Sequence, residues 1–567
     1  MDTQRLILLF IFGFSLLMLW DAWEKENRPK PAAEKQQAVP SAAAPAKPSA
    51  TPAAPAAVPT APSAVPTAPS APRPAEPAVP TTAPAARGET ITVQTDVLIA
   101  EIDTLGATLK RVELLKHRDS RDASKNQVLL GPEHQYEAQS GLAGESGPNH
   151  NTPWSATPVR PALEAGQNPL EVRLEGRGKD GVVVQKVYRF KRDSYLIDVD
   201  LEIQNGGTAP VQPAAYFQTK HNGKRSTDAN TIAESFGAQS FHGFAVFSDE
   251  KKFEKIELPD VDKGKASYLK QSNNGWLAYV EHYFVSGWFP PAKADRSYDV
   301  VKVGDAYYGR LRLALGTLAP GAATKISVPF YAGPQEQRRL DAVAPGFDYV
   351  VDYGWLAIIA WPLFWLLEKF HTLSGNWGVA IILLTVLIKL VFFPLSAASY
   401  KSMAKMKLIT PRLQRIREMY EHDRQRMNQA MMELYRTEKI NPLGGCFPIL
   451  VQIPVFIALY WVLLAAIELR HAPFVLWIKD LSALDPYYVL PILMTVTMIL
   501  QTKMNPVPPD PVQAKVMQFM PYIFSIFFFF FPAGLVLYWL VNNILSIAQQ
   551  WQIQRMFDRD KPAHAKR

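Results

Sequence analysis

The stretch FMPYIFSIFFFFFPAGLVLYWLVNNILSIA, residues 519–548, decides the fold class of this chain. Its thirty almost uninterrupted apolar residues exceed the roughly 20 that an α-helix needs to cross a bilayer. They form either one oversized helix or two short helices broken near Pro532 and Gly534, since proline cannot continue the hydrogen-bond ladder of a helix. Either arrangement places this part of the chain in a membrane.

The positive charges choose between one helix and two. Residues 401–440 contain ten Lys and Arg against five Asp and Glu, and residues 551–567 contain five against two, which together make up the net charge of +8. Further apolar stretches cover residues 377–395, 447–467 and 487–502. Basic segments tend to stay on the cytoplasmic side of the membrane. If the N-terminus is cytoplasmic, both basic segments lie in the cytoplasm only when residues 519–548 form a hairpin. We therefore predict six spans. Each half of the hairpin, with about fifteen residues, would extend roughly 22 Å and thin a bilayer core of about 30 Å.

The N-terminal region reads as an anchor followed by a tether. Residues 6–23 are almost wholly apolar and suit either a transmembrane anchor or a secretory signal. Bulky and charged residues at 21–25 favour an uncleaved anchor over residues 1–28, although small residues at 41–44 leave cleavage open. Residues 29–87 contain 16 Pro and 21 Ala, which predicts an extended linker.

Residues 88–345 carry the alternation of β-strands. Apolar residues at 197, 199, 201 and 203 alternate with polar residues, and residues 182–184 and 326–331 are expected to form further strands. Recurring Gly and Pro turn signals predict one large antiparallel β-sandwich on the outer side of the membrane. Glu281 and His282 resemble an acid/base pair, but neighbours on a strand point to opposite faces.

Two helical segments lie at the membrane surface. Residues 346–371 are predicted to form an interfacial amphipathic helix, because the apolar run at 355–367 is too short to span and carries three Trp. Residues 372–567 would form the membrane core, with a cytoplasmic helical hairpin at residues 401–440 that breaks near 421–423. Its methionines form either an adaptable docking surface or, as we prefer, the seam between the two helices.

Lys389 lies inside an apolar helix, where an ammonium group costs about 2.5 to 3.5 kcal/mol. It could extend its side chain to the membrane surface, about 9 Å away along the helix. Thr385, four residues earlier, lies on the same helical face. Gln452 and Phe456 are likewise four residues apart.

Polar positions recur at the cytoplasmic end of the other spans, where Tyr538 and Asn542 are again four residues apart. Four helices with polar faces at the same depth predict one water-filled groove that opens inward and is closed outward. Separate interhelical hydrogen bonds are the competing interpretation for Gln452 and Asn543.

The remaining chemistry is sparse. One cysteine excludes a disulfide framework, and neither a phosphate-binding Gly-rich loop nor a metal-binding His spacing occurs. We expect no cofactor, no metal and no enzymatic activity. Two alternatives stay open: an ion or small-solute transporter with a half-channel around Lys389, and a carbohydrate-active enzyme that uses Glu281 and His282.

Residues 441–456, NPLGGCFPILVQIPVF, resemble the YidC membrane protein insertases of Gram-negative bacteria. Further matching stretches are SMAKM at 402–406, LWIKDLS at 476–482, DPYY at 485–488 and PAGLVLYW at 532–539. The resemblance covers essentially everything after Gly354, and the preceding anchor, linker and β domain follow the Gram-negative arrangement.

The resemblance implies a polytopic α-helical membrane protein with a hydrophilic groove, plus a large periplasmic all-β super-sandwich domain. Lys389 occupies the place of the family's usual groove arginine, which keeps the charge but loses the planar guanidinium. Thr385 and Gln452 would line the groove, and Phe456 and Tyr538 would lie along the route of the inserting helix.

The implied function is that of an insertase and chaperone that inserts and folds nascent proteins in the inner membrane, alone or with the Sec translocon. Implied partners are nascent membrane proteins, the ribosome, the signal recognition particle or its receptor, the Sec translocon with its accessory subunits, and the lipid bilayer. Both termini would be cytoplasmic and the large domain periplasmic.

Overall fold

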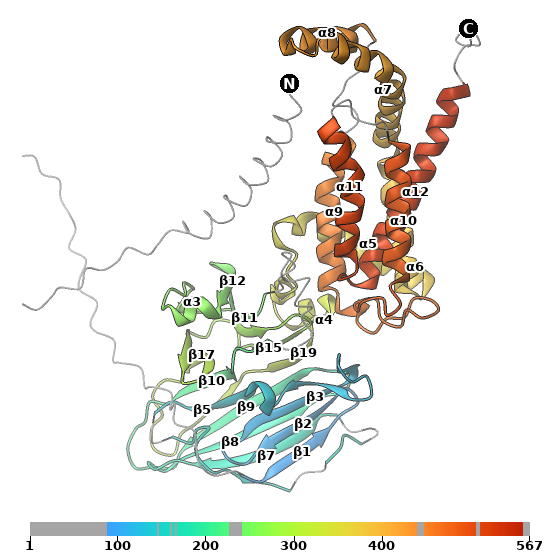
Figure 1. The fold of residues 1–567 in the computed structure, drawn as a ribbon. Coiled ribbons are helices and arrows are strands. Elements are labelled where there is room, and N and C mark those ends of the chain that lie inside the picture. Colours follow the sequence, from blue (N-terminus) through green and yellow to red (C-terminus); the bar gives the residue numbers. More distant parts are fainter. Residues whose placement is uncertain are drawn as a thin grey trace, which may run out of the picture. The chain divides into compact units, whose positions relative to one another are not determined.

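The computed structural model describes residues 88–505 and 511–559, apart from residues 145–146, 159–160, 165, 167, 226–240 and 439–446. The predicted anchor at residues 1–28 and the linker up to residue 87 lie outside the described residues. The described part consists of a β-sandwich followed by a helical region (Figure 1).

The β-sandwich consists of two antiparallel sheets. The first contains, in spatial order, β1 (Thr90–Gln94), β2 (Leu98–Asp103), β3 (Thr108–Arg118), β5 (Glu137–Leu142), β10 (Ala214–His221), β17 (Ala306–Ala314), β16 (Arg296–Val303) and β13 (Gln271–Ser272), with β4 (Asn126–Leu130) beside β3. The second contains β12 (Lys252–Glu257), β11 (Gly243–Ser248), β14 (Trp276–Val280), β15 (Phe284–Trp288), β19 (Phe330–Pro334), β9 (Leu196–Asn205), β8 (Val182–Phe190), β7 (Leu170–Arg177) and β6 (Ser155–Ala156), with β18 (Ala323–Ser327) beside β9. The predicted antiparallel sandwich is confirmed.

Strand β9 shows how the sequence pattern produces the sandwich. Its apolar residues at 197, 199, 201 and 203 are all buried, as the period-two alternation predicts. Asp200 is also buried, because Arg189 and Lys325 both form ion pairs with its carboxylate. The predicted single strand over residues 326–331 is wrong, since β18 ends at Ser327 and β19 begins at Phe330. Pro329 separates the two strands, because proline has no N–H to donate to a strand neighbour.

The two sheets pack face to face over a core of large aromatic side chains. Phe217 of β10 packs against Trp288 of β15 with ring centroids 5.2 Å apart. Lys186 of β8 is fully buried in this core, where its ammonium donates hydrogen bonds to the carbonyl oxygens of Gly106, Ala107 and Ser140. Burial lowers the pKa of Lys186 well below its ordinary value. The lysine thus joins the second sheet to the first through main-chain acceptors.

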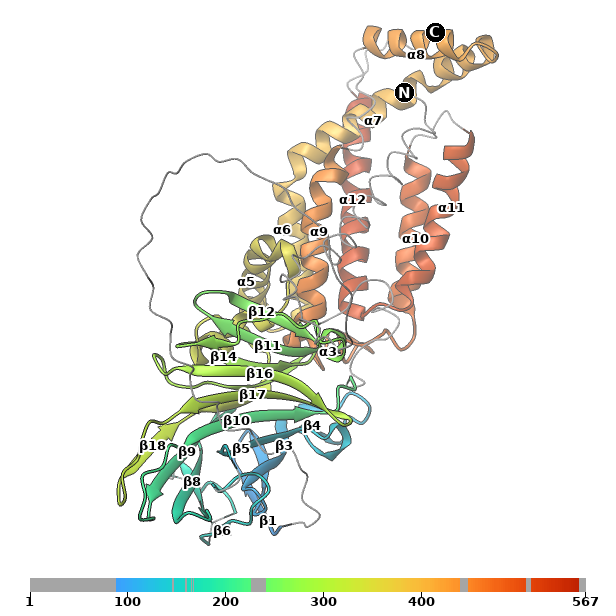
Figure 2. The same cartoon turned by 90° about the vertical axis from the view of Figure 1, so that its left-hand side faces the viewer.

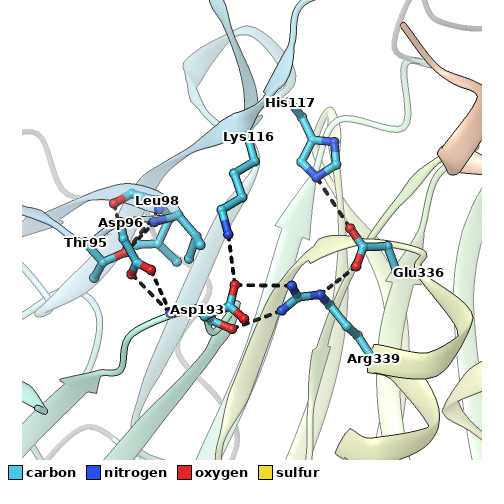
Figure 3. Close-up of polar contacts among 9 residues, drawn as sticks. Thr95, Asp96, Leu98, Lys116, His117, Asp193, Glu336 and Arg339 are labelled. Carbon is cyan, nitrogen blue, oxygen red and sulfur yellow. Dashed lines mark hydrogen bonds and ion pairs between the residues drawn. The ribbon is translucent and has the colours of Figure 1, made fainter. Parts of the chain in front are cut away.

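Helix α4 (Gln337–Val343) is attached to the sandwich by a polar network (Figure 3). Arg339 bonds both Glu336 and Asp193, with N to O distances of 2.6 and 3.2 Å. Lys116 of β3 approaches the same Asp193 carboxylate at 2.9 Å. The network connects the start of the helix, the turn between β8 and β9, and the C-terminal end of β3 in the first sheet.

The helical region follows the sandwich along the chain. Its helices are α5 (Ala357–Ser374), α6 (Trp377–Val391), α7 (Phe393–Met419), α8 (Arg424–Thr437), α9 (Phe447–Ala465), α10 (Val489–Met504), α11 (Pro511–Phe528) and α12 (Ala533–Arg559); a short helix, α3 (Leu258–Asp262), lies in the β domain. Helix α8 lies across the end of α7 in both views (Figures 1 and 2). The chain turns between these two helices at residues 420–423.

Length and composition single out one helix of the described region, Gly354–Ser374, as able to cross a membrane. The pair Trp377–Val391 and Phe393–Met419, bent by 66°, passes the same criterion when taken together. Shorter apolar helices cover Val451–Ala465, Val489–Met504 and Ala514–Phe528. The count of six spans therefore stays a prediction.

The apolar stretch at residues 519–548 is broken, as predicted, between α11 and α12. Helix α11 has 18 residues and α12 has 27, so each helix extends beyond the apolar stretch, and the expected length of about fifteen residues per half stays a prediction. Both helices continue into polar sequence, where Gln, Lys and Arg are good helix formers. The apolar run at residues 355–367 begins in the turn before α5, and α5 itself continues beyond it to Ser374.

Candidate functional site

Helices α6, α9 and α12 carry the residues that the sequence singled out, and α12 lies beside both α6 and α9 (Figure 2). Lys389 is on α6, Gln452 and Phe456 are on α9, and Tyr538 and Asn542 are on α12. The three helices therefore bring together side chains that are up to 157 positions apart in the chain, as in the pair of Lys389 and Ser546.

Lys389 is held by α12. Its ammonium donates a hydrogen bond of 2.7 Å to the hydroxyl of Ser546, and only 6% of the residue is exposed. Gln549, also on α12, approaches the carbonyl oxygen of Lys389 at 3.5 Å. Among the residues that the structure describes, no carboxylate forms an ion pair with this lysine. Its positive charge is therefore solvated by a hydroxyl and is not neutralised by an acid.

Ser546 is the centre of this arrangement. Its hydroxyl donates to the carbonyl oxygen of Asn542 at 2.7 Å, so the oxygen is left to accept from Lys389. Tyr400 of α7 forms a further side-chain hydrogen bond with Ser546. The serine thus connects the buried ammonium to the first turns of the helix that leads into α8.

Ser546 and Tyr400 are not among the site residues that the sequence predicts. A signal for Ser546 was present, because it continues the spacing of four residues from Tyr538 through Asn542 along one face of α12. No comparable signal marks Tyr400, since its approach depends on the bend between α6 and α7.

Aromatic rings lie further along the same face of α12. The ring of Phe456 is 6.0 Å from Tyr538 and 4.7 Å from Trp539, measured between centroids. Phe528 of α11 packs edge-on against Trp539 at 4.4 Å. Tyr538 is buried, with 4% of its surface exposed. These rings join α9, α11 and α12 into one apolar cluster.

The other predicted polar residues are satisfied in different ways. Thr385 is buried and its hydroxyl donates to the carbonyl oxygen of Ile381 on its own helix. Gln452 and Asn542 are half-buried. Asn543 donates to the sulfur of Met494 on α10 at 3.3 Å, which fits the competing interpretation of separate interhelical contacts. Lys389 therefore meets Ser546 of α12, whose hydroxyl also bonds the main-chain carbonyl of Asn542, whereas Asn543 contacts α10.

The outer surface of α10 and α11 is strongly apolar. Large hydrophobic side chains that are at least 44% exposed here are Ile492, Leu493, Val496, Leu500, Val516, Phe519, Tyr522, Ile523, Phe524 and Ile526. A contiguous apolar surface of this size is unfavourable in water and is typical of helices that contact lipid.

A β-sandwich outside the membrane, joined to a helical region with an apolar outer surface and a buried lysine, defines a membrane protein with a large extramembrane domain. Residues 90–366 match the family model described as YidC periplasmic domain, and residues 369–561 match the model described as 60Kd inner membrane protein. The chain belongs to the YidC family of membrane protein insertases.

Two full-length relatives support the same conclusion. The chain is 50% identical over 561 residues to the membrane protein insertase YidC of Nitrosospira multiformis, covering 98% of each chain. It is 50% identical over 560 residues to the protein of that name from Dechloromonas aromatica, again covering 98% of each. A crystal structure of an active YidC insertase covers 82% of this chain and 92% of its own, with 20% identity and a TM-score of 0.37.

These relatives make the chain a membrane protein insertase of the inner membrane with a periplasmic domain, and not an enzyme. Nascent membrane proteins are its substrates. The transporter alternative is not favoured, since the full-length relatives carry insertase names.

Proposed function

We propose that the chain inserts its substrates through a hydrophilic groove that opens to the cytoplasm and is charged by Lys389. The main support is the environment of this ammonium, which bonds a serine hydroxyl and has no acidic partner among the described residues. A positive charge that the protein does not neutralise attracts an acidic group of the substrate. Thr385, Gln452 and Asn542 would contribute polar surface around it.

The first step is capture of the substrate's short hydrophilic tail. An acidic group on the tail replaces Ser546 as the partner of the Lys389 ammonium, which gains a charged acceptor in place of a neutral one. A lysine makes this pair as a point charge, without the paired hydrogen bonds of an arginine. The contact is therefore easily exchanged, as a transient intermediate requires.

The substrate's apolar helix then moves along the aromatic residues. Phe456 and Tyr538 lie on facing helices with ring centroids 6.0 Å apart, and the half-buried Phe456 would present the apolar face of this pair to the substrate. The driving force comes from the substrate, because Leu, Ile, Phe and Val each favour insertion by about 0.3 to 0.6 kcal/mol. A span of twenty such residues offsets the transfer of a short polar tail.

Short helices lower the remaining barrier. Helix α10 has 16 residues, which corresponds to about 24 Å at 1.5 Å per residue, against a hydrocarbon core of about 30 Å. A bilayer that thins beside such helices shortens the path of the tail. Helix α5 carries the exposed Trp365, and Trp355 is exposed in the turn just before it; the segment would lie along the membrane surface as an amphipathic helix.

The cytoplasmic hairpin formed by α7 and α8 would bring clients to the groove. Residues 401–440 carry five more positive than negative charges, which suits acidic protein surfaces, ribosomal RNA or anionic lipid. We propose that the ribosome, the signal recognition particle or its receptor, and the Sec translocon with its accessory subunits act here or beside the helical core. Both chain termini would then be cytoplasmic.

Charge reversal at Lys389 tests the groove. In a strain depleted of its own insertase, Lys389→Glu should slow insertion of a single-span reporter with an acidic tail about tenfold, equivalent to roughly 1.4 kcal/mol of barrier. The same reporter with a neutral tail should be much less affected, because it makes no pair with the lysine. Protease accessibility of the tail in spheroplasts measures insertion.

Two controls separate charge from folding. Lys369→Glu makes the same charge reversal on exposed α5 and should leave both reporters unaffected. Lys389→Arg should keep insertion of the acidic reporter. Undiminished insertion of the acidic reporter by Lys389→Glu would remove this lysine from the mechanism while leaving the family assignment intact.

A further inference from the structure

Three potential metal ligands converge in the β-sandwich, far from Lys389 in sequence. His221 ends β10 in the first sheet, whereas His242 directly precedes β11 and Glu281 directly follows β14 in the second sheet. Strands β11 and β14 are paired so that Gly243 lies opposite Val280, which places His242 and Glu281 at the same end of the pair. One ligand atom from each of the three residues lies within 4.8 Å of the others.

The spacing of His221 and Glu281 fits two ligands of one ion. Nε2 of His221 is 3.5 Å from Oε1 of Glu281, which is longer than the 2.7 to 3.2 Å of an N–H···O hydrogen bond. Ligand atoms about 2.1 Å from a tetrahedral zinc ion are roughly 3.4 Å apart. Within the part of the chain that the structure describes, Nε2 of His221 has no hydrogen-bond partner. A buried nitrogen of this kind gains a partner when an ion binds.

The three side chains supply the atom types that zinc binds. His221 is fully buried and His242 is half-buried, and the nearby Glu281 side chain offers a carboxylate oxygen beside the two imidazoles. Imidazole nitrogen and carboxylate oxygen are both common zinc ligands.

Tyr279 orients the two rings. Its hydroxyl is 2.6 Å from Nδ1 of His221 and 3.1 Å from Nε2 of His242. The amide of Gly223 also donates to Nδ1 of His221 at 2.9 Å, so without an ion the ring proton lies on Nε2. When an ion binds Nε2, the ring proton moves to Nδ1 and donates a hydrogen bond to the oxygen of Tyr279. The hydrogen bond from the Gly223 amide to Nδ1 is then lost. We therefore expect micromolar affinity, weaker than that of a structural zinc site.

A cavity gives the ion an entry path. His242 is half-buried and lines a cavity of about 600 Å³, together with Gln135, Asp262, Lys302 and Tyr307. A site with three protein ligands leaves the fourth position of a tetrahedral ion for water or another small ligand. His242 is the one of the three ligands that lines this cavity.

We propose that His221, His242 and Glu281 form a binding site for Zn²⁺ in the periplasmic domain, with its fourth position open to the cavity. Two imidazoles and one carboxylate are the protein ligands of one class of zinc site, which leaves the fourth position open. The site is independent of the insertion mechanism, because none of its residues lies in the helical core.

Metal titration of the whole protein tests the site. The full-length chain, in detergent and without a histidine tag, is stripped with a chelator and titrated with Zn²⁺ by calorimetry. We expect one ion per chain with micromolar affinity and a raised thermal unfolding midpoint when zinc is present. Co²⁺ in place of Zn²⁺ should give the intense visible absorption of a tetrahedral ion.

Variants assign the binding to these residues. His242→Gln, at a half-buried position on the cavity, should weaken zinc binding at least tenfold and remove the zinc-dependent rise of the unfolding midpoint. Glu281→Gln should also weaken zinc binding and remove the zinc-dependent rise of the unfolding midpoint. If this variant does not fold, the result for His242→Gln alone tests the proposal. His117→Gln, which changes another half-buried histidine of the β domain, should bind zinc like the unaltered chain. Absence of one-to-one binding, or equal affinity in His242→Gln, would overturn the proposal.

Discussion

His150 makes the stability of the β domain depend on pH. The side chain is buried, and the Tyr216 hydroxyl bonds its Nδ1 while accepting from the backbone N–H of His150 at 3.0 Å. Burial, together with the nearby charges of Lys186 and Arg310, lowers the pKa of His150 to about 4. The folded state therefore disfavours the protonated ring, whereas the unfolded chain protonates it near pH 6.5.

The sign of the effect follows from this difference. Above pH 6.5 the ring is neutral in both states and the stability is fully present; it is lost as the pH falls from 6.5 towards 4. At about 1.4 kcal/mol per unit, His150 accounts for roughly 3 kcal/mol by pH 4. Hydrogen exchange of β10 amides in the whole protein should show a shallower pH dependence for His150→Asn than for the unaltered chain. Equal slopes would contradict the assignment.

At the same scale, the sequence could reveal Lys389 but not the proposed zinc site, although it drew attention to Glu281 as a candidate acid or base beside His282. A lysine inside an apolar run is visible without any structure, because its desolvation cost is a property of the run itself. His221, His242 and Glu281 are separated by 21 and 39 positions and meet only through the pairing of β11 with β14 and the packing of the two sheets. No periodicity within one segment encodes such a meeting.

Single helices and strands could be predicted where the apolar residues follow one clear local pattern. The alternation in β9 and the break before α12 are local patterns, so they could be predicted from sequence. The ends of α11 and α12 could not, since helix propensity extends into polar residues beyond the apolar run. Pro329 marks the limit between β18 and β19, and this break was missed because the flanking residues are apolar on both sides.

The hairpin of α7 and α8 is held by a small apolar seam. Ile409 and Leu413 are buried there, and the seam is completed by Met406, Met431, Leu434 and Tyr435. Met419 and Met432, by contrast, are 70% and 58% exposed. The preferred interpretation of the methionines as a seam is thus right for Met406 and Met431, while two others are available for docking.

Truncation at the seam should loosen the hairpin. Leu413→Ala removes a fully buried side chain from a cluster that has few other members, so we expect a loss of about 2 to 3 kcal/mol in the local stability of α8. Hydrogen exchange of α8 amides, or proteolysis between the two helices, measures it. Met432→Ala on the exposed face is the matched control and should change little. Equal protection in Leu413→Ala and the control would show that the seam does not hold the hairpin.

For the molecule as a whole, the charge distribution and the helix order make one joint prediction. The hairpin carries five excess positive charges, and moving such a segment across the membrane is strongly disfavoured. The β domain carries no comparable excess and is the part exported. The hairpin and the β domain should therefore be accessible from opposite sides, whatever the depth of the short helices.

Cysteine labelling tests this arrangement with few changes, since Cys446 is the only cysteine. In a Cys446→Ser background, Met419→Cys places a thiol at the exposed end of α7, and Glu250→Cys places one in the exposed turn between β11 and β12. A membrane-impermeant maleimide should label Glu250→Cys in intact spheroplasts and Met419→Cys only in inverted vesicles. Labelling of Met419→Cys in intact spheroplasts would place the basic hairpin outside the cell membrane. Lys389 and Tyr400 lie on the helices that lead into that hairpin. A groove that opens to the cytoplasm would then have no support.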